Sequence, residues 1–449
     1  MSITVRLKKG LDLQLVGGID NISAVTEVTA ADNAIFPDDF PGFEPKLDVK
    51  EGQSVALGEP LLHDKRDERI KLVSPVEGKV KAVVRGERRH IERIVIEPAA
   101  AAAADARPLS IEGISRLSAD EARTELMQRG LWALMRQRPY DIVPEPDIAV
   151  RDIFITAFDS APLADNRIDY SAQELQAGIA MLGKLTAGKI YLSRRPNAKL
   201  PSLAGVEDIV VEGPHPAGNV GVQIANIAPV NKGEAVITLD ITSLGRIGRT
   251  LLSGSFDNSA CVALTGSEVA EPQLIKTTIG ADIASTIKGR LKTADHHQRI
   301  ISGNVLTGIK VSTDSYLHFP WRQLTVIAEG DDVDEFMGWA SLSPKKMSQS
   351  RSFLSWLFGP KKFNPDARLL GGRRALILSE QYERLMPMDI VAEYLLKAII
   401  GRDIEKMEQL GIYEVAPEDF ALGEWADASK IPAQQIVREG LDYLRKELR

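Results

Sequence analysis

The stretch GLWALMRQRPYD, residues 130–141, combines aromatic rings with guanidinium groups in one short segment. Its candidate side chains are Trp132, Arg136, Arg138 and Tyr140. Aromatic faces stack on flat rings, and arginine presents a rigid set of hydrogen-bond donors to carbonyl oxygens. The segment could therefore bind a flat, oxygen-bearing ring such as a quinone. The alternative is simple packing of aromatic residues where a helix ends.

A second candidate is GPHPAGNVG, residues 213–221, which directly follows a predicted strand. Its glycines have the spacing of a phosphate-binding loop, but Asn219 and Val220 replace the lysine and Ser/Thr that such a loop needs. The prolines also remove N–H groups that a phosphate would use. His215 could still contact a ligand, because open α/β folds bind ligands at the carboxyl edge of the sheet. The alternative is a rigid turn whose histidine is satisfied locally.

A third candidate is RSFLSWLFGPKKF, residues 351–363, an apolar segment with a basic rim. Its candidate docking residues are Phe353, Trp356, Leu357 and Phe358. If these side chains are exposed, they mark a contact with a partner or a membrane. If they are buried, the segment is an irregular part of the core.

The fourth candidate is Lys65, in LLHDKRDERIKLVSPVEGKV, residues 61–80. The segment predicts two short strands joined by a charged turn, and it resembles the hairpin on which biotinyl and lipoyl carrier domains attach their cofactor. Acceptor lysines there lie in Met-Lys-Met or Asp-Lys-Ala contexts on a tight turn. Here the sequence RDER follows the lysine, and we expect a turn one or two residues longer. A solvated charge is the expected role of Lys65, with covalent modification as the alternative.

The composition is that of an ordinary globular protein, with 44% hydrophobic and 26% charged residues among 449. The formal charge of -7 is spread along the chain, so nothing favours a nucleic-acid partner. No apolar run approaches the roughly 18–20 residues that cross a bilayer, and the start MSITVRLKKG lacks the apolar stretch of a signal peptide. We therefore expect a soluble, cytoplasmic chain.

Cys261 is the only cysteine in the sequence. Intrachain disulfides, cysteine-ligated zinc sites and an iron–sulfur cluster held by this chain alone are thereby excluded. Neither the Ser/His/Asp signature of a hydrolase nor the HEXXH spacing of a zinc protease occurs, so we expect no catalytic residues and no metal site. Since Cys261 lies in a predicted strand, we expect a small core residue.

Hydrophobic periodicity divides the chain into four predicted domains. Residues 1–100 show period-two alternation broken by glycines, which predicts a small β-sandwich or barrel. An alanine-rich linker follows at 98–108. In residues 101–255 helices alternate with strands, which predicts a parallel, doubly wound sheet. Two capping boxes mark helix starts there, at Ser118 with Glu121 and at Ser171 with Glu174.

The remaining chain changes pattern twice. Residues 256–335 contain short strands around one helix, which predicts a small α+β domain. Residues 336–449 begin with an irregular segment and end in predicted helices at 388–401, 403–410 and 432–448.

Several blocks, in order along almost the whole chain, resemble the A-subunit family of the bacterial Na+-translocating NADH:quinone oxidoreductase. The blocks are RLKKGLDLQLVGG (6–18), residues 58–97, GLWALMRQRPYD, ITAFDSAPLA (155–164), GPHPAGNVG, RIISGNVLTG (299–308), RSFLSWLFG and ERLMPMDI (383–390). The resemblance implies an N-terminal biotinyl/lipoyl-like barrel-sandwich, a Rossmann-like α/β domain, a β-grasp (SLBB-like) domain and a C-terminal helical domain.

The family is similar in architecture to the flavin-bearing NADH subunit of respiratory complex I and to the C subunit of the Rnf complex. Those proteins hold iron–sulfur clusters with grouped cysteines, whereas the corresponding stretch here, ALGEWADASKIPAQQ (421–435), has none. The glycine-rich flavin loop is also missing. The resemblance thus implies a redox-subunit fold that binds no cofactor covalently or by itself, with flavins, iron centres, NADH and quinone on other subunits.

The function implied is that of a peripheral subunit on the cytoplasmic face of the bacterial inner membrane. Its partners would be the other five subunits, especially the membrane subunits, and it would support reduction of ubiquinone or a related quinone coupled to Na+ export. It would have no complete active site of its own.

The family has been connected with quinone binding, which adds the aromatic turn AIFPDDFPGFEP (34–45) to the candidates. The predicted quinone-binding residues are Phe36, Phe40, Phe43, Trp132, Arg136, Arg138, Tyr140 and His215. The chain departs from close relatives around residues 20–33. Two other hypotheses stay open: a carrier protein with biotin or lipoate on Lys65, and a free-standing nucleotide or flavin binder that uses residues 213–221.

Overall fold

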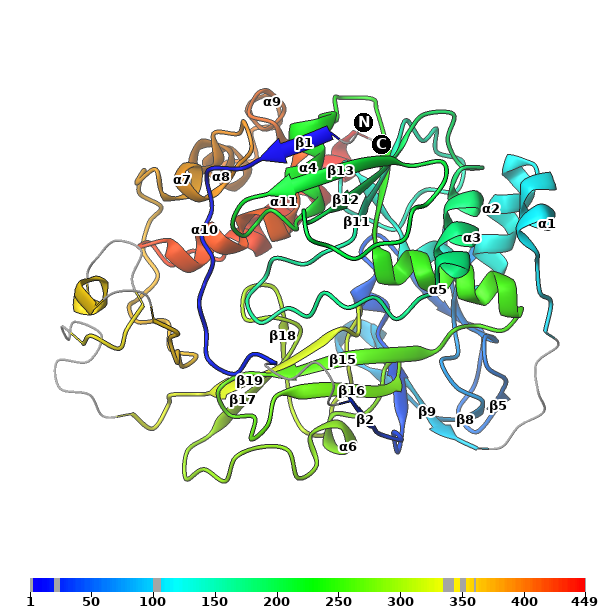
Figure 1. Cartoon of the computed structure of the whole chain (residues 1–449), viewed down its shortest axis with the longest axis horizontal. Helices are drawn as coiled ribbons and strands as arrows, with labels where there is room; N and C mark the ends of the chain where they lie inside the picture. The colour runs from blue at the N-terminus through cyan, green and yellow to red at the C-terminus, as the bar shows by residue number, and fades with distance from the viewer. Residues whose placement is uncertain are drawn as a thin grey trace.

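The computed structural model describes residues 3–19, 25–99, 106–333, 343–347, 353–358 and 361–448. Figure 1 shows two sheets at different levels of the molecule, with the N-terminal barrel-sandwich beside both and the C-terminal helices against the upper sheet. Among the described residues, no helix is both long enough and apolar enough to cross a membrane.

The N-terminal domain is a sandwich of two antiparallel sheets, in the strand orders β3-β9-β8-β5 and β4-β6-β7. Their bounds are β3 Asn33–Ile35, β4 Pro45–Leu47, β5 Ser54–Val55, β6 Pro60–Asp64, β7 Asp67–Val73, β8 Gly78–Arg85 and β9 Ile91–Pro98. Fully buried Leu61, Leu62, Ile94 and Ile96 join the two sheets. The alternation of apolar residues in the sequence therefore does form a barrel-sandwich.

The turn between β6 and β7 contains only Lys65 and Arg66, because Asp64 pairs with Asp67. The prediction of a lengthened turn is wrong. The Arg66 N–H donates to Asp64 Oδ1 at 2.9 Å, and its Nη2 donates to Asp64 Oδ2 at 2.6 Å. These two hydrogen bonds to the Asp64 carboxylate close the turn. Lys65 is exposed, as predicted for a solvated charge.

The second domain is a doubly wound sheet in the order β1-β13-β12-β11-β14-β10, parallel except for the edge strand β10. Its strands are β1 Ile3–Arg6, β10 Arg136–Arg138, β11 Ile153–Thr156, β12 Ile190–Arg194, β13 Glu207–Glu212 and β14 Val236–Asp240. Its helices are α1 Ile111–Arg116, α2 Ala119–Gln128, α3 Ala172–Leu182, α4 Val220–Ile227 and α5 Ile241–Ser253. Both predicted capping boxes are present, at the starts of α2 and α3.

Helices α3 and α5 lie against each other on one face of this sheet. A Cβ atom on Gly248 would lie 1.7 Å from the carbonyl oxygen of Glu174, and one on Gly178 would lie 2.6 Å from that of Leu244. The two glycines therefore permit a backbone approach that any side chain would prevent. This close contact fixes the position of α5, which lines the site described below.

The third domain is a six-stranded sheet in the order β18-β17-β19-β15-β16-β2. Its elements are β2 Val25–Glu27, β15 Ser259–Thr265, β16 Gln273–Thr278, β17 Gln298–Ser302, β18 Ile309–Val311, β19 Gln323–Ala328 and the short helix α6 Ile283–Ile287. Strand β15 runs parallel to β19 and antiparallel to β16. This mixed sheet around one helix is the predicted β-grasp-like arrangement.

The first residues of the chain take part in both of these sheets. Strand β1 pairs in parallel with β13, and β2 pairs in parallel with β16. Residues 3–6 therefore belong to the sheet of the second domain and residues 25–27 to the sheet of the third, although the predicted boundaries place both in the first domain. The boundaries themselves stay a prediction.

The C-terminal region is helical and packs on the face of the α/β sheet opposite α3 and α5. Its helices are α7 Gln381–Leu385, α8 Ala392–Ile400, α9 Ile404–Gln409, α10 Ala421–Ala426 and α11 Ala433–Glu447. Buried Leu395 and Leu441 share one apolar cluster with Phe154, Tyr191 and Ile209 of the sheet. The helical region is thus part of the same packed body as the α/β domain.

Candidate functional site

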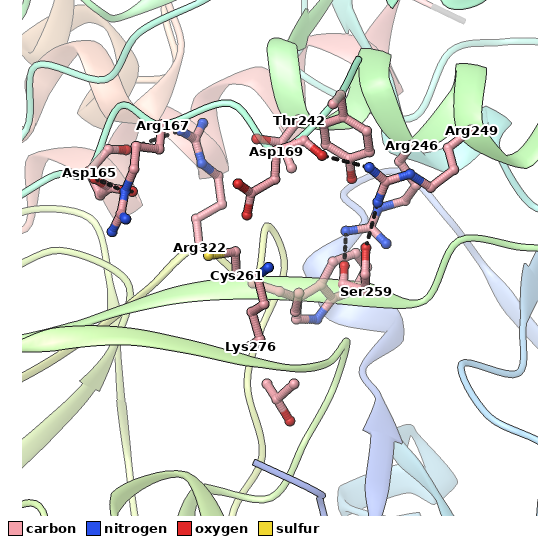
Figure 2. A pocket seen from close by; sticks show the side chains of 14 residues that line it. Asp165, Arg167, Asp169, Thr242, Arg246, Arg249, Ser259, Cys261, Lys276 and Arg322 are labelled. Carbon is pink, nitrogen blue, oxygen red and sulfur yellow. Dashed lines mark hydrogen bonds and ion pairs between the residues drawn. The ribbon is translucent and has the colours of Figure 1, made fainter. Parts of the chain in front are cut away.

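A cavity of about 230 Å³ lies where the α/β sheet faces the third domain (Figure 2). Its lining residues are Asp165, Arg167, Asp169, Tyr170, Thr242, Arg246, Arg249, Ser259, Ala260, Cys261, Lys276, Thr277, Trp321 and Arg322. Strands β11 and β14 are neighbours in the sheet, yet the chain leaves β11 toward β12 and β13 on one side. The cavity therefore lies at a topological switch point, the position at which open α/β folds bind ligands.

The upper wall comes from the segment after β11 and from α5. The segment contributes Asp165, Arg167, Asp169 and Tyr170, and the helix contributes Thr242, Arg246 and Arg249. The three helical residues are four and three positions apart, so one face of α5 presents them all. The N-cap residue Asp240 begins this helix at the end of β14.

The lower wall is one face of the third sheet, formed by its inner strands β15 and β16. Cys261 of β15 pairs with Lys276 of β16, and Figure 2 shows both side chains rising from the strands into the cavity. Trp321 and Arg322 precede β19 and close one side. Two domains thus contribute opposite walls of one site.

Two arginines of the cavity lie over aromatic rings. The Arg249 guanidinium lies 4.2 Å from the Tyr170 ring centroid, and that of Arg246 lies 5.5 Å from the Trp321 ring. The Tyr170 hydroxyl donates to Asp257 Oδ2 at 3.0 Å, and burial raises the pKa of this tyrosine. These contacts tie Arg246 and Arg249 of α5 to aromatic side chains of the cavity wall.

Most cationic groups of the cavity have a carboxylate within reach. Arg249 donates to Glu174 at 2.7 Å, Arg167 Nε donates to Asp165 at 3.2 Å, and Arg246 Nη1 lies 3.9 Å from Asp257. Arg322 is held more loosely, at 3.4 Å from Asp240 Oδ2 and 3.4 Å from the carbonyl of Asp165. For Lys276, the described part of the chain offers no hydrogen-bond or ion-pair partner to its ammonium group.

Cys261 lies in a strand, but it lines the cavity and is only partly buried. The expectation of a core residue is therefore wrong, because its face of β15 looks toward the α/β domain instead of into the sheet's own core. Burial, together with the nearby Asp169 carboxylate, raises the pKa of the thiol to about 12. At neutral pH the group is a protonated thiol and a poor nucleophile.

The structure brings part of the predicted quinone set together at the junction of three domains. Phe40 is 3% exposed and contacts the Phe319 ring at 5.3 Å, while the Arg136 guanidinium lies 5.8 Å from the Phe40 ring and 5.2 Å from that of Phe319. Phe36 stacks on His318 at 3.9 Å. Phe43 is buried in the same core cluster as Phe40. We call these residues, with Trp321, the aromatic junction.

The donors of Arg136 are used within the protein. Its Nη2 donates to the carbonyl of Asp39 at 2.7 Å, and its Nη1 donates to that of Ala133 at 3.1 Å. Burial lowers the pKa of this arginine. The contacts of Arg136 are those expected if segment 130–141 serves in packing. Its predicted role in quinone binding stays a prediction.

The other members of segment 130–141 lie elsewhere. Trp132 is fully buried, and its indole N–H donates to the carbonyl of Pro144 at 2.8 Å. Arg138 lies 3.0 Å from Glu418 and 3.5 Å from Asp419, both in the C-terminal region. The Tyr140 ring meets that of Tyr413 edge-on at 6.3 Å. These contacts join the α/β domain to the C-terminal helices.

His215 is 4% exposed, and its Nδ1 lies 3.0 Å from Ser160 Oγ, which accepts the Gly218 N–H at 2.8 Å. Burial lowers the pKa of His215, which favours the neutral form of the ring. Its Nε2 has no partner in the described part of the chain. The turn lies after β13, away from the switch point, so His215 does not join the cavity.

The predicted docking residues lie in or beside the 3-10 helix Leu354–Phe358. Trp356 is 52% and Leu357 is 55% exposed, while Phe353 is half-buried and has the Lys346 ammonium 5.3 Å from its ring centroid. The Phe358 side chain lies outside the described residues. Of the two alternatives, exposure is the one that the structure favours.

Sequence reasoning did not find the cavity. Its residues come from five separate stretches, and only Cys261 among them is singled out by the sequence. The available signal was Arg246 and Arg249 on one face of the helix that follows β14, but ion-paired helical arginines are common and would not have marked a site.

Comparison with known proteins shows which family the sequence matches. The sequence model of the NqrA N-terminal barrel-sandwich hybrid domain matches residues 5–99, that of the NqrA second alpha/beta domain matches residues 117–256, and that of the NQRA C-terminal domain, an SLBB domain, matches residues 261–313. The NqrA protein of Neisseria meningitidis serogroup A (strain Z2491), which is named as part of a Na(+)-translocating NADH-quinone reductase, is 33% identical over 99% of this chain and all of that relative.

The chain belongs to the NqrA family. The NqrA proteins of Hahella chejuensis and Saccharophagus degradans are 35% and 34% identical over the same shares of both chains. The predicted family and fold class are thereby confirmed. Among solved structures, a chain of an NAD+-reducing [NiFe]-hydrogenase shows a faint likeness, with a TM-score of 0.35 and 12% identity over 49% of each chain.

Proposed function

We propose that this chain is a peripheral subunit of a Na+-translocating NADH:quinone reductase and supports reduction of ubiquinone or a related quinone coupled to Na+ export. The subunit works at the cytoplasmic face of the membrane. Its partners are the other five subunits, chiefly the membrane subunits. Membership of the NqrA family supports this proposal.

The distribution of exposed apolar side chains is the observation that supports docking of this chain onto other subunits. Of the fourteen large hydrophobic residues that are exposed in the described chain, nine lie between positions 354 and 400. They are Leu354, Trp356, Leu357, Leu369, Ile377, Leu378, Val391, Tyr394 and Ile400. The nine residues lie in one stretch of the sequence, and exposed large apolar side chains are common at protein interfaces. We call this set the apolar segment.

The subunit binds no cofactor covalently or by itself, and the flavins, iron centres and NADH of the complex bind to the other subunits. A single cysteine supports this, because an iron–sulfur cluster needs several thiolate ligands. The subunit therefore contributes architecture, and no catalytic residue is assigned to it.

Co-purification from detergent-solubilised membranes tests the proposal. The double variant Leu357→Glu/Ile400→Glu places charges at two sites that are 55% and 58% exposed, so folding is preserved while docking is lost. We expect recovery of the partner subunits to fall by about tenfold or more, as expected when interface anchors are removed. The matched control is Ile309→Glu, at a site that is 47% exposed and lies outside the apolar segment.

Either of two results would contradict the proposal. The unaltered chain could be recovered from membranes without any partner, or the double variant could retain its partners as well as the control does. Thermal unfolding of each purified variant separates loss of docking from loss of folding.

A further inference from the structure

A groove of about 920 Å³ lies between helix α10 and the third sheet (Figure 1). Strands β17 and β19 contribute Ile301 and Ile327 to one wall, and α10 contributes Trp425 to the other. Much of the remaining lining comes from the stretches 363–374 and 428–434. Pockets of roughly 300–1,000 Å³ hold organic ligands of moderate size. The groove is therefore large enough for a ligand much bigger than a single ion.

One part of the groove is apolar. Leu13 and Leu15 are each 7% exposed and belong to a small hydrophobic cluster. Val305, Leu306 and Trp425 pack against this cluster, and all five side chains line the groove. Because the last three are only half-buried, part of their apolar surface remains to be covered. Covering apolar surface is favourable, so this part of the groove suits a hydrocarbon chain.

The rest of the groove is basic. Seven lysine and arginine side chains line it, against two carboxylates. The chain as a whole has the opposite balance, with a formal charge of -7. The positive charge is therefore a local property of the groove, and it favours an anionic ligand.

Two of the seven cations are neutralised by the protein itself. Arg299 Nε donates to Glu329 at 2.8 Å, and Arg368 Nη2 lies 2.6 Å from Asp366 Oδ2. The other groove carboxylate, that of Glu424, accepts the Gln434 N–H at 2.9 Å.

Three further cations lack such a partner. Within the described ranges of the chain, no hydrogen-bond or ion-pair partner is present for the side chains of Arg373, Arg374 and Lys430. Lys430 is half-buried, and burial lowers the pKa of its ammonium group. A cation that has lost hydration without gaining a counter-charge is stabilised when an anion binds beside it.

We propose that this groove binds an anionic phospholipid, with an acyl chain on Leu306 and Trp425 and the phosphate at Arg373, Arg374 and Lys430. A molecule with one apolar and one anionic end complements both parts of the groove. The choice of a lipid among anionic amphiphiles rests on the proposed function, which places the chain at a membrane.

Two observations favour a lipid over an acidic peptide. A bound peptide needs partners for its backbone groups, but the Gln434 side chain beside the apolar part already donates to the Leu306 carbonyl at 3.1 Å. In addition, Leu369 is 51% exposed and belongs both to the groove and to the apolar segment. The groove therefore adjoins a surface on which basic and large apolar side chains occur together, as they do on proteins that lie on a bilayer.

Co-sedimentation of the purified full-length chain with lipid vesicles tests the proposal. We expect binding to vesicles of equal parts phosphatidylcholine and phosphatidylglycerol, and binding about tenfold weaker or less to pure phosphatidylcholine. The double variant Arg373→Gln/Arg374→Gln should raise the Kd for the mixed vesicles about tenfold or more, because each basic residue near an anionic surface contributes about fivefold. The matched control is Arg88→Gln/Arg89→Gln, which removes two adjacent exposed arginines of the barrel-sandwich and should leave the Kd unchanged.

A soluble short-chain lipid tests the apolar part of the groove. In calorimetric titration with dihexanoyl phosphatidylglycerol we expect one site per chain. Leu306→Gln should raise the Kd about fivefold or more, because a polar group would face the acyl chain. Leu306→Met keeps an apolar side chain and should bind like the unaltered protein. Unfolding curves of all variants establish that the fold is intact.

Several outcomes would overturn the proposal. Equal binding to both kinds of vesicle, or equal binding by the arginine variant and its control, would remove the phosphate site. Unchanged titration of Leu306→Gln, or displacement of the lipid by inorganic phosphate at concentrations near the lipid's Kd, would mean that no acyl chain lies in the groove. Absence of lipid binding together with chemical crosslinks from Lys430 to a partner subunit would assign the groove to a protein segment instead.

The two kinds of experiment separate this proposal from the function on which it rests. If the chain co-purifies with its partner subunits but binds no phosphatidylglycerol, the lipid assignment fails while the subunit's role stands. If the unaltered chain is recovered from membranes without partners, the proposed function fails, whatever the vesicles show.

Discussion

The aromatic junction and the switch-point cavity are neighbours that share Trp321, and each places arginines over aromatic rings. In the junction, Arg136 donates to the carbonyls of Asp39 and Ala133, and the Phe40 ring fills the space beneath it. In the cavity, Arg322 has only long contacts and Lys276 projects into an open volume. The same residue types therefore build a closed core in one place and an open site in the other. What differs is whether the protein's own groups satisfy the donors.

The largest expected effect is a loss of stability caused by a substitution in the aromatic junction. Phe40→Ala should lower the free energy of unfolding by about 3–5 kcal/mol, because a ring that is 3% exposed is removed and a cavity is left. Chemical denaturation measures the change. Phe40→Leu is the control and should lose less. If Phe40→Ala were as stable as the unaltered chain, the junction would not be a packed core.

A smaller loss is expected for Arg136→Met, which keeps the aliphatic length and removes the guanidinium. The carbonyls of Asp39 and Ala133 lose their donor, so we expect a loss of about 1–3 kcal/mol in the same assay. An unchanged free energy of unfolding together with weaker quinone binding would contradict this prediction. Arg136 would then be a group that binds a ligand and not a group that stabilises the fold.

The third prediction uses the pH dependence of Cys261. The pKa of the Cys261 thiol is about 12, so the reactive thiolate is scarce at neutral pH. As long as the pH stays below this pKa, each rise of one pH unit increases the thiolate fraction about tenfold. Alkylation by iodoacetamide, followed by intact mass, should therefore speed up steadily between pH 7 and pH 10. The sequence has no other cysteine that could interfere. A rate that levels off near pH 9 would mean that the cavity does not shield the thiol.

The smallest effect is expected for Lys276→Gln. Because the described structure gives this ammonium group no partner, its removal should change the free energy of unfolding by less than about 0.5 kcal/mol. A loss above 1 kcal/mol would show that Lys276 has a structural role, and the cavity would then resemble the closed junction.

The parts of the fold that depend on local pattern could be predicted from the sequence. Ser118 and Ser171 begin helices with capping boxes as expected, because a capping box is defined within four residues. Phe40 and Arg136 are both predicted to bind quinone, which stays a prediction, and the structure places the Arg136 guanidinium 5.8 Å from the Phe40 ring. The prediction for the hairpin turn fails because Asp64 and Arg66 close it through side-chain bonds, which the strand pattern does not reveal.

The cavity could not be predicted because topology creates it. Cys261 and Lys276 face Arg246 only after a third sheet has been placed against the crevice between β11 and β14. No spacing of residues in the sequence indicates that the third sheet lies against this crevice. Nor does any local pattern indicate that a segment as early as Val25 joins the sheet of the third domain.

That early segment has a consequence for how the protein is made. Ile3 pairs with Ile209 and Val25 with Leu274, so neither strand can find its partner until a strand far along the chain has left the ribosome. The barrel-sandwich can close on its own strands in the meantime, whereas the second and third sheets stay incomplete at one edge. Long-range pairing of this kind is slow and leaves exposed strand edges. The start of the chain therefore stays without its sheet partners while the barrel-sandwich closes, and its pairing completes one edge of each of the two later sheets.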